Sequence, residues 1–300
     1  MPSSASNAKA YVFLVITTLI WGGNSVAGKM AVDHVSPMML NSLRWIIAGI
    51  ALATFAGPQV RRDWPVIRRH LPLLLGYGAV GFTGFNAFLY LALQYTSAIN
   101  AVIAQAAVPM AIFALNFILF RTGVVAAQWI GFALTLSGVA LTVSHGEPSR
   151  LMALDLNRGD ALMMAAVLVY AIYTVTLRYK PAIHWQSLIS ASVFGALLAS
   201  LVPLSVEAAL GQTRLPDATG WAVALFAGLM PSLISQILYV RGVEMIGPNR
   251  AGLFINLIPI FGTLLSLAFL GETLHAFHIG ALVLALSGIA VAERGRSARA

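Results

Sequence analysis

The sequence contains no cysteine and few charged residues of either sign. With no cysteine in 300 residues, structural disulfides, thiolate chemistry and cysteine-bound metal are excluded. Charged residues make up 9% of the chain, against roughly 25% in a soluble domain. Hydrophobic residues make up 59%. So few charges cannot cover the surface of a water-soluble protein of this length, and the composition therefore indicates an integral membrane protein.

Acidic residues are scarce, and none lies in the middle of an apolar segment. The ten are Asp33, Asp63, Glu147, Asp155, Asp160, Glu207, Asp217, Glu244, Glu272 and Glu293. Carriers driven by protons or sodium ions usually keep a titratable group within the membrane, so we predict a facilitator or an exchanger. The same lack counts against a membrane-embedded enzyme, and we expect no catalytic residue.

The sequence predicts no cofactor and no metal site. GYGAVG (residues 76–81) matches the dinucleotide pattern GxGxxG, but it lies inside an apolar segment with no strand before it. We expect its glycines and the next one to form a thin helix face for close packing: Gly76, Gly78, Gly81 and Gly84. His275 and His278 lie three residues apart, and we interpret them as interfacial histidines rather than metal ligands.

Long apolar segments follow one another almost from end to end. Roughly 18 or more consecutive apolar residues suffice to cross a bilayer as a helix. We predict an all-α integral membrane protein with ten transmembrane helices, over residues 10–30, 37–56, 70–93, 97–120, 126–144, 160–177, 187–206, 219–243, 249–270 and 275–292. Residues 94–96 are expected to form a tight hairpin, because a helix of about 50 residues is too long for one bilayer.

The basic residues orient these helices. With the N-terminus in the cytoplasm, 13 of the 18 Lys and Arg residues lie at cytoplasmic ends or loops. Those toward the other side are Lys29, Arg44, Arg150, Arg158 and Arg214. The positive-inside rule therefore places both termini in the cytoplasm. We expect the chain to lie in the inner (plasma) membrane. The net charge of +8 needs no nucleic-acid partner, since RRDWPVIRRH (residues 61–70) is expected to be a cytoplasmic loop beside anionic lipid.

The chain repeats itself with a period of about 150 residues. Pro109 in VPMAIFALNFILF corresponds to Pro259 in IPIFGTLLSLAFL (259 − 109 = 150). Such self-similarity indicates two copies of one unit, here residues 1–148 and 149–300. Five spans per copy is an odd number, so the second copy enters the membrane from the opposite side. The repeats are therefore predicted to be inverted, with the functional site at their interface.

Uncharged polar residues and mid-span prolines mark the expected interior. An amide in hydrocarbon is costly unless it finds a partner, and a proline leaves the carbonyl four residues earlier without its helical partner. The candidates are Asn24, Asn86, Gln105, Gln236, Asn256, Pro109 and Pro259. For each residue alone, lining a cavity and joining two helices remain open alternatives. We favour the cavity for Asn86 and Gln236, which the repeat relates (236 − 86 = 150).

Aromatic residues fall in the same predicted helices as these amides. Those placed in the candidate site are Trp21, Tyr77, Phe82, Tyr90, Tyr170, Tyr173 and Tyr239. Tryptophan and tyrosine also serve as anchors at membrane interfaces, and that role is open for some of them. Aromatic rings beside amides would form a mostly apolar pocket with a few polar groups, which suits an amphipathic small molecule.

Several local motifs occur at matching places in the two copies. The first copy has WGGN (residues 21–24) followed by Lys29, and ALQYTSAINAVI before Val108 and Pro109. The second has GVEMIGPNRAGLF before Pro259, then LGETL and LSGIAV. Through these motifs the chain resembles, over nearly its whole length, the drug/metabolite transporter superfamily with two EamA-type domains. It departs from the pattern where the first copy has FRTGV in place of LGETL and lacks the acidic residue.

The resemblance implies ten helices with both termini inside. It also implies a central cavity lined by the first, third, fourth, sixth, eighth and ninth spans. Members similar to this chain export amino acids, including aromatic ones, and others move nucleotide sugars or other metabolites. The motifs are specific for family and topology and weak for substrate.

We therefore predict an inner-membrane transporter that exports small metabolites, first of all aromatic or apolar amino acids, by alternating access. One alternative is a carrier of another solute class, such as a sugar-like metabolite, an organic cation or a drug. Another is a membrane scaffold that transports nothing. The expected partners are a small-molecule substrate and the lipid bilayer. The sequence leaves the oligomeric state open and is compatible with a monomer.

Overall fold

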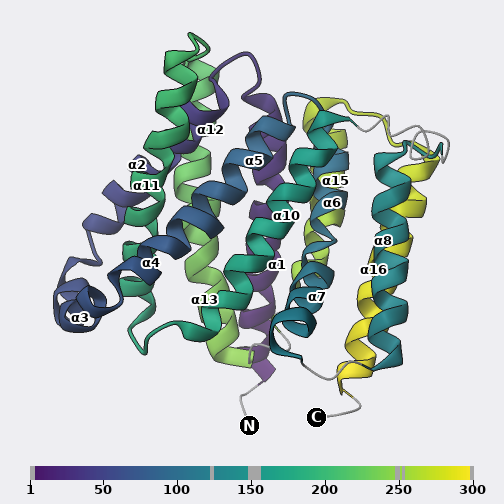
Figure 1. Ribbon diagram of the computed structural model, residues 1–300, viewed down its shortest axis with the longest axis horizontal. Helices are drawn as coiled ribbons and strands as arrows, with labels where there is room; N and C mark the ends of the chain where they lie inside the picture. The colour runs from purple at the N-terminus through teal and green to yellow at the C-terminus, as the bar shows by residue number, and fades with distance from the viewer. Residues whose placement is uncertain (1–3, 122–124, 148–156, 247–250, 252–253, 298–300) are drawn as a thin grey trace.

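The computed structural model describes residues 4–121, 125–147, 157–246, 251 and 254–297, and these residues form helices and connections without any strand. Most helices run side by side along one direction (Figure 1). The beginning of α1 and the end of α16 lie at the same end of the bundle, as an even number of crossings requires. The predicted all-α class is therefore confirmed for the described residues.

The helices follow one another with short connections. The first predicted repeat contains α1 (Ser4–Met30), α2 (Pro37–Ala53), α3 (Gly57–Arg69), α4 (Leu71–Tyr77), η1 (Gly78–Gly84), α5 (Phe85–Ala92), α6 (Ala98–Gln105), α7 (Val108–Phe120) and α8 (Ala126–Val143). The second contains α10 (Arg158–Thr176), η2 (Leu177–Tyr179), α11 (Trp185–Ala209), α12 (Ala218–Leu229), η3 (Met230–Ile234), α13 (Ser235–Ile246), η4 (Ile255–Leu257), α15 (Ile258–Leu270) and α16 (Ala276–Ser297).

Seven helical segments of the described residues are long and apolar enough to cross a membrane. They are Ala8–Met30, Leu71–Ala92, Ala98–Phe120, Ala126–Val143, Arg158–Tyr179, Trp185–Ala209 and Ala218–Ile246. An eighth is formed if α2 and α3, which are bent by 104° at their junction, count as one span. Ile255–Leu270 and Ala276–Ala292 are apolar but shorter. The predicted number of ten transmembrane helices thus exceeds the seven or eight helices of the described residues that are long and apolar enough to cross a membrane.

Two connections test the predicted boundaries. The break expected at residues 94–96 is present, because α5 ends at Ala92 and α6 begins at Ala98. Ser97 caps α6 by accepting a hydrogen bond from the backbone N–H of Asn100 at 3.0 Å. The expectation of a loop over residues 61–70 is wrong, since most of this segment belongs to helix α3. Basic and apolar residues recur in this segment at helical spacing, so an amphipathic helix places them on different faces.

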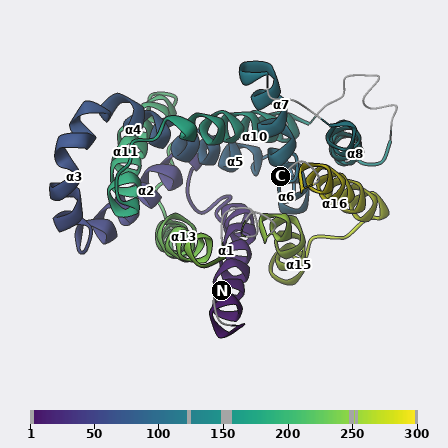
Figure 2. The ribbon, with the colours of Figure 1, turned by 90° about the horizontal axis from the view of Figure 1, so that it is seen from below.

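The two predicted repeats are interleaved rather than side by side. In the first repeat α1 packs against α13 and α15, while in the second α10 packs against α5 and α7. The helix α11 packs against α2, and α8 packs along α16. Each main packing partner therefore belongs to the other repeat, and Figure 2 shows α1 enclosed between α13 and α15 on one side of the bundle. Any motion of one repeat relative to the other must therefore slide these packed helices past one another.

Irregular turns recur at related positions in the two repeats. The π-helical turn η1 ends at Gly84 and η3 ends at Ile234 (234 − 84 = 150). The break between α6 and α7 falls at Ala106 and Ala107, and the 3₁₀ turn η4 covers the matching positions 256 and 257. A proline follows the break between α6 and α7, lies within η3 and follows η4, at positions 109, 231 and 259. Proline has no backbone N–H, so it removes one hydrogen bond of a regular helix and favours an irregular turn. Single π-turns inside α-helices are frequent at functional sites.

One glycine of the predicted thin face shows why small residues are needed there. A Cβ at Gly78 would collide with the backbone of Ser192 and Ala196 in α11, so the helices approach at backbone distance. The prediction is wrong for Gly76, where a Cβ would meet nothing within 4 Å. The close packing of η1 on α11 thus depends on Gly78 and fixes the position of α5, which follows it.

Candidate functional site

An arginine lies at the centre of a polar cluster in the interior. Arg44 is midway along α2, and its side chain is only 2% exposed. The helix places it there because Leu40, Asn41, Trp45 and Ala48 on the same side are also buried. The guanidinium of Arg44 therefore stays inside the bundle, and its predicted place toward the non-cytoplasmic side of the membrane stays a prediction.

Four neutral residues from three other elements surround the guanidinium. Its Nη1 donates to Tyr90 Oη at 2.5 Å, to Asn24 Oδ1 at 3.3 Å and to Asn86 Oδ1. Its Nε and Nη2 both donate to Ser232 Oγ, at 3.1 and 2.7 Å. Asn24 Nδ2 donates to Asn86 Oδ1 at 3.3 Å, and Tyr90 Oη donates to Asn24 Oδ1 at 3.2 Å. The four residues lie on α1, α5 and η3, so both predicted repeats contribute.

The serine of this cluster is held by the irregular turn that precedes it. Pro231 has no N–H, so the carbonyl of Ala227 lacks its helical partner. Ser232 Oγ donates to that carbonyl at 2.8 Å. The hydroxyl therefore satisfies the carbonyl and accepts from Arg44 at the same time, which links the proline turn directly to the arginine.

An aromatic wall continues from the arginine. The Arg44 guanidinium lies 4.7 Å from the centre of the Trp45 ring, which stacks on Phe82 with ring centres 5.3 Å apart. Phe82 contacts Tyr173 at 5.8 Å, and Tyr173 contacts Tyr170 at 5.6 Å and Tyr77 at 5.9 Å. The cluster thus presents charge and amides beside a continuous set of rings, as a site for an amphipathic molecule requires.

The remaining predicted residues form two further groups. Trp21 and Tyr239 contact each other with ring centres 5.3 Å apart. The proline turns of the two repeats meet at a small pocket of about 20 Å³, whose lining includes Gln105, Pro109, Asn256 and Pro259. Gln105 Nε2 also donates to Ser25 Oγ of α1 at 3.0 Å.

The structure thus joins Asn24, Asn86 and Tyr90 in one cluster and places Gln236 outside it. Gln236 is partly buried on α13, and the described hydrogen bonds of the cluster do not include it. The sequence analysis missed Arg44, Trp45 and Ser232 as site residues. A charge in the middle of an apolar helix was the signal for Arg44, because such charges usually face the bundle interior.

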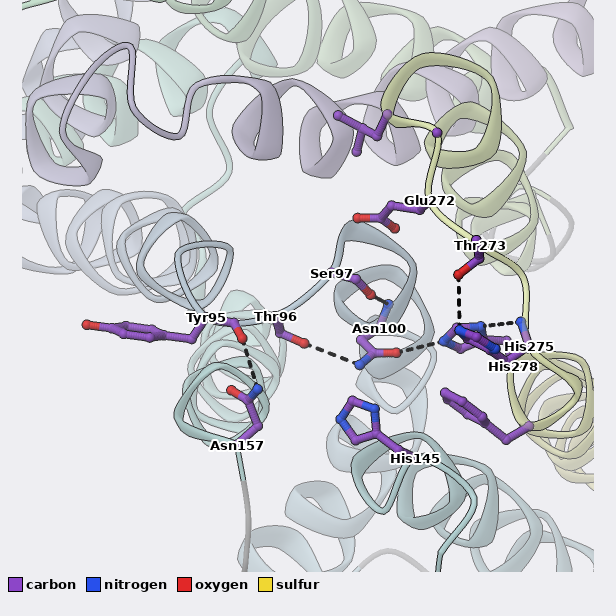
Figure 3. Close-up of a pocket in the computed structure, with 13 residues that line it drawn as sticks. Tyr95, Thr96, Ser97, Asn100, His145, Asn157, Glu272, Thr273, His275 and His278 are labelled. Carbon is purple, nitrogen blue, oxygen red and sulfur yellow. Dashed lines mark hydrogen bonds between the residues drawn. The ribbon is translucent and has the colours of Figure 1, made fainter.

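A second, larger pocket lies at the end of the bundle opposite the two termini. It measures about 500 Å³ and is lined by Tyr95, Thr96, Ser97, Asn100, His145, Asn157, Leu270, Gly271, Glu272, Thr273, His275, Phe277 and His278. Figure 3 shows a chain of hydrogen bonds across it, in which Asn100 joins Thr96 to His278. Thr96 Oγ1 in turn donates to Asp160 Oδ1 at 2.9 Å. These bonds tie the ends of α5, α6, α10 and α16 together.

The histidines of this pocket are engaged with protein groups. His278 Nδ1 accepts from the backbone N–H of His275 at 3.1 Å, and its Nε2 lies 3.0 Å from Asn100 Oδ1. His275 Nε2 lies 3.0 Å from Thr273 Oγ1. Among the described residues, no group of three or more His, Asp and Glu has an arrangement that would hold a metal ion. The side chain of His278 is buried among these groups.

Comparison with known proteins gives a family match over most of the chain. The model of the EamA-like transporter family matches residues 8–144 and again residues 157–293. The uncharacterized transporter YyaM of Bacillus subtilis is 22% identical over 285 residues, covering 94% of this chain and 93% of that protein. A solved crystal structure superimposes with a TM-score of 0.64 at 19% identity, covering 98% of this chain and 99% of the other, and shows the same fold.

Two further relatives have names that state what they transport. A "probable amino-acid metabolite efflux pump" of Salmonella typhimurium is 24% identical, covering 92% of this chain and 91% of that protein. A "probable terminal-alkyne amino-acid exporter" of Streptantibioticus cattleyicolor is also 24% identical, covering 96% and 94%.

Proposed function

The chain belongs to the EamA-like transporter family, and from this premise we propose that it exports small metabolites across the inner membrane. Amino acids with aromatic or apolar side chains are the class that the site fits best. We further propose that ten helices in two inverted repeats, residues 1–148 and 149–300, alternate the access of this site between the two sides of the membrane.

The observation that carries this proposal is the cluster around Arg44. Helices from both proposed repeats supply it, as an alternating-access site between inverted halves requires. Its polar atoms lie beside the rings of Trp45, Phe82 and Tyr173, so one end of a bound molecule meets charge and the other meets apolar surface. The names of two relatives support amino acids as the substrate class.

The same cluster disfavours one of the alternative solute classes. A guanidinium at the centre of the site repels an organic cation, and the neutral residues that surround it offer no compensating negative charge. Sugar-like solutes and neutral drugs meet no such repulsion, so they belong in the substrate panel.

Counterflow in liposomes tests the proposal. Vesicles that contain the purified protein and a high internal concentration of one unlabelled solute should take up the labelled solute from outside. The panel should include phenylalanine, leucine, aspartate, a hexose and a quaternary amine, with a protonophore present and no ion gradient. Uptake of phenylalanine or leucine above that of protein-free vesicles is expected, and uptake confined to the hexose or the amine would contradict the proposed substrate class.

Two asparagine variants show whether the cluster is the transport site. Asn24→Leu removes a residue that bonds to Arg44, Asn86 and Tyr90, and counterflow should fall by at least about tenfold, the effect of losing about 1.4 kcal/mol. Asn116→Leu is the matched control, because Asn116 on α7 bonds to the carbonyl of Ile112 in its own helix. Equal transport by the two variants would remove the cluster from the pathway.

A further inference from the structure

The charge on Arg44 has no acidic partner among the described residues. The ion pairs there join His34 to Asp217, His145 to Asp160, Arg214 to Asp33, and Arg241 to Glu244. All ten acidic residues of the sequence lie outside the middle of the predicted spans, and none of them belongs to α2, the helix that carries Arg44. A buried charge that lacks a counter-charge carries a penalty of several kcal/mol, and within a membrane it marks a substrate or ion site.

The hydrogen bonds of Arg44 are unequal on its two sides. The Nη1 group has three acceptors, supplied by Asn24, Asn86 and Tyr90. The Nε–Nη2 edge, by contrast, directs both of its N–H groups at the single oxygen of Ser232. That edge has the geometry with which arginine binds both oxygens of a carboxylate in parallel. A single hydroxyl thus accepts from both N–H groups of an edge that can also bind two anionic oxygens.

The serine is also placed where it can leave. Ser232 lies in the π-turn η3, and its hydroxyl has a second partner in the Ala227 carbonyl that Pro231 leaves free. The hydroxyl can turn from Arg44 because its other partner, the main-chain carbonyl, does not depend on the guanidinium. The Nε–Nη2 edge is then open, while Nη1 remains fixed by the amides and Tyr90.

We propose that the Nε–Nη2 edge of Arg44 binds the carboxylate of the transported solute, which displaces Ser232 Oγ. The carboxylate supplies the counter-charge that the protein lacks, and the apolar body of the solute then lies along Trp45 and Phe82. Arg44 is thus the residue that determines specificity for carboxylates over the corresponding carboxamides. The inference rests on the proposed function and narrows its substrate class to solutes with a carboxylate.

Ligand-induced thermal stabilisation tests this binding apart from transport. The protein in lipid nanodiscs is heated with phenylalanine, 3-phenylpropionate, leucine or isovalerate, and with the carboxamide of each acid. A ligand that binds the folded state raises the unfolding temperature in proportion to its affinity. At least one acid should bind at least about tenfold more tightly than its amide. Sodium chloride and sodium sulfate serve as anion controls.

Variants then assign the selectivity to one residue. Arg44→Lys keeps a charge but loses the two-pronged edge, so the preference for acid over amide should fall by at least about tenfold. Ser232→Ala leaves Arg44 in place and removes the competing hydroxyl, so the preference should persist or increase. Ser266→Ala is the matched control, because Ser266 makes the same type of hydrogen bond to a carbonyl of its own helix, that of Gly262, away from the cluster.

Three outcomes would overturn the inference. The first is equal binding of acids and amides by the wild-type protein while it still catalyses counterflow of amino acids. That result would overturn the inference but leave the proposed function standing. The second is stabilisation by chloride or sulfate alone. The third is loss of the acid preference in Ser232→Ala with its retention in Arg44→Lys. If amino acids give neither counterflow nor stabilisation but isovalerate or 3-phenylpropionate binds through Arg44, the amino-acid proposal fails and the carboxylate site remains.

Discussion

At the scale of single residues, the two amides that the repeat relates have different surroundings. Asn86 accepts from Asn24 and Arg44, and its own amide group donates to the carbonyl of Phe82 at 2.8 Å. Gln236, at the matching position of the other repeat, is partly buried and outside this cluster. The pseudo-symmetry of the sequence therefore does not extend to the hydrogen bonds of the two side chains.

The first prediction compares these two residues. Asn86→Leu removes the acceptor of Asn24 Nδ2 and one of the three acceptors of Arg44 Nη1. The loss costs about 1–3 kcal/mol, so counterflow should fall by at least about tenfold. Gln236→Leu should reduce counterflow less than Asn86→Leu does. The measurement is initial counterflow rate per mole of reconstituted protein. Equal losses in both variants would show that the repeat symmetry, rather than the cluster, governs the pathway.

A second residue-scale feature is an exposed pair outside the membrane-spanning segments. Asp217 Oδ2 lies 2.7 Å from His34 Nδ1, and Asp217 Oδ1 accepts from the backbone N–H of Gly220 at 2.9 Å. The hydrogen bond from His34, together with that of Gly220, lowers the pKa of Asp217 below its usual value. The ionised carboxylate thus ties the start of α12 to the connection after α1.

This pair predicts a dependence of stability on pH. The unfolded carboxyl has a pKa of about 3.9, so the stabilisation is complete above that pH and is lost as the pH falls toward the lower pKa of the folded state. Asp217→Asn should therefore show a smaller decrease in unfolding temperature between about pH 5 and pH 3 than the unmodified protein. His34→Gln should give an intermediate decrease because the hydrogen bond from Gly220 remains. An unchanged pH profile in Asp217→Asn would contradict the prediction.

At the scale of elements, the turn between α5 and α6 is held by one charge on each side. Lys29 Nζ donates to the carbonyls of Leu93 and Thr96, both at 2.8 Å, at the end of α5. Glu272 accepts from the backbone N–H groups of Ala98 and Ile99 at 2.7 and 2.9 Å, at the start of α6. A cation at a helix C-terminus and an anion at a helix N-terminus both stabilise the helix, because each lies next to the opposite end of the helix dipole. The acid of LGETL thus has a structural role.

The third prediction concerns this cap. Glu272→Gln keeps an acceptor but removes the charge, and it should lower the free energy of unfolding by about 1 kcal/mol. Glu207→Gln is a matched variant, since Glu207 accepts from Ser36 Oγ at 2.5 Å and from the backbone N–H of Met38 at 3.0 Å at the start of α2. Thermal unfolding in detergent measures both, and no loss in either variant would refute capping as their role.

Another element was not foreseen as a helix. Helix α3 lies at the outer edge of the bundle, bent by 104° from α2 (Figure 2). Ile67 on one side is buried, whereas Trp64 is 51% exposed and the four arginines 61, 62, 68 and 69 are exposed. Basic amphipathic helices with tryptophan lie in the membrane interface, where the ring meets lipid and the charges meet phosphate.

The fourth prediction follows from this position. In vesicles of brominated phospholipid, Trp64 should be quenched more by bromine near the headgroup than by bromine near the bilayer centre. Trp64→Phe is the control, because the difference in quenching between it and the unmodified protein isolates the signal of this residue among the six tryptophans. Quenching that Trp64→Phe leaves unchanged would place α3 away from the membrane.

At the scale of the whole molecule, the interleaved packing and the location of both ends are the main features. Each repeat supplies helices that pack between helices of the other, so the two halves share one interior. The beginning of α1 and the end of α16 lie at one end of the bundle, and the connection between α11 and α12 lies at the other (Figure 1). The distribution of basic residues favours the cytoplasm for the end that carries the termini.

The fifth prediction tests that orientation. A reporter enzyme that is active only outside the cytoplasm should give no activity when fused to Ala300. The same reporter inserted after Gln212, in the exposed connection between α11 and α12, should be active. Activity in cells, normalised to the amount of fusion protein, measures both. The opposite pattern would reverse the orientation, and equal activity would contradict an odd number of crossings between Gln212 and Ala300.

Much of the architecture followed from the sequence by itself. Apolar length and helix-ending residues are properties of neighbouring residues, and they predicted the helical membrane class and the break at residues 94–96. The repeat period is found by comparing the sequence with itself, and it predicted the matching proline turns at Pro109 and Pro259. Local composition determines these features because the bilayer requires every backbone donor and acceptor to be satisfied within a helix.

Only the tertiary structure decided which polar groups meet. The rotation of each helix about its axis and the choice of its neighbours depend on packing between segments far apart in the chain. One cluster joins residues that lie up to 208 positions apart in the sequence (232 − 24 = 208), namely Asn24, Arg44, Asn86 and Ser232. The sequence showed that a charge was present within α2. The fold determined that this charge faces neutral groups, because the side chains that hydrogen-bond to it in the described part of the chain are two asparagines, a tyrosine and a serine.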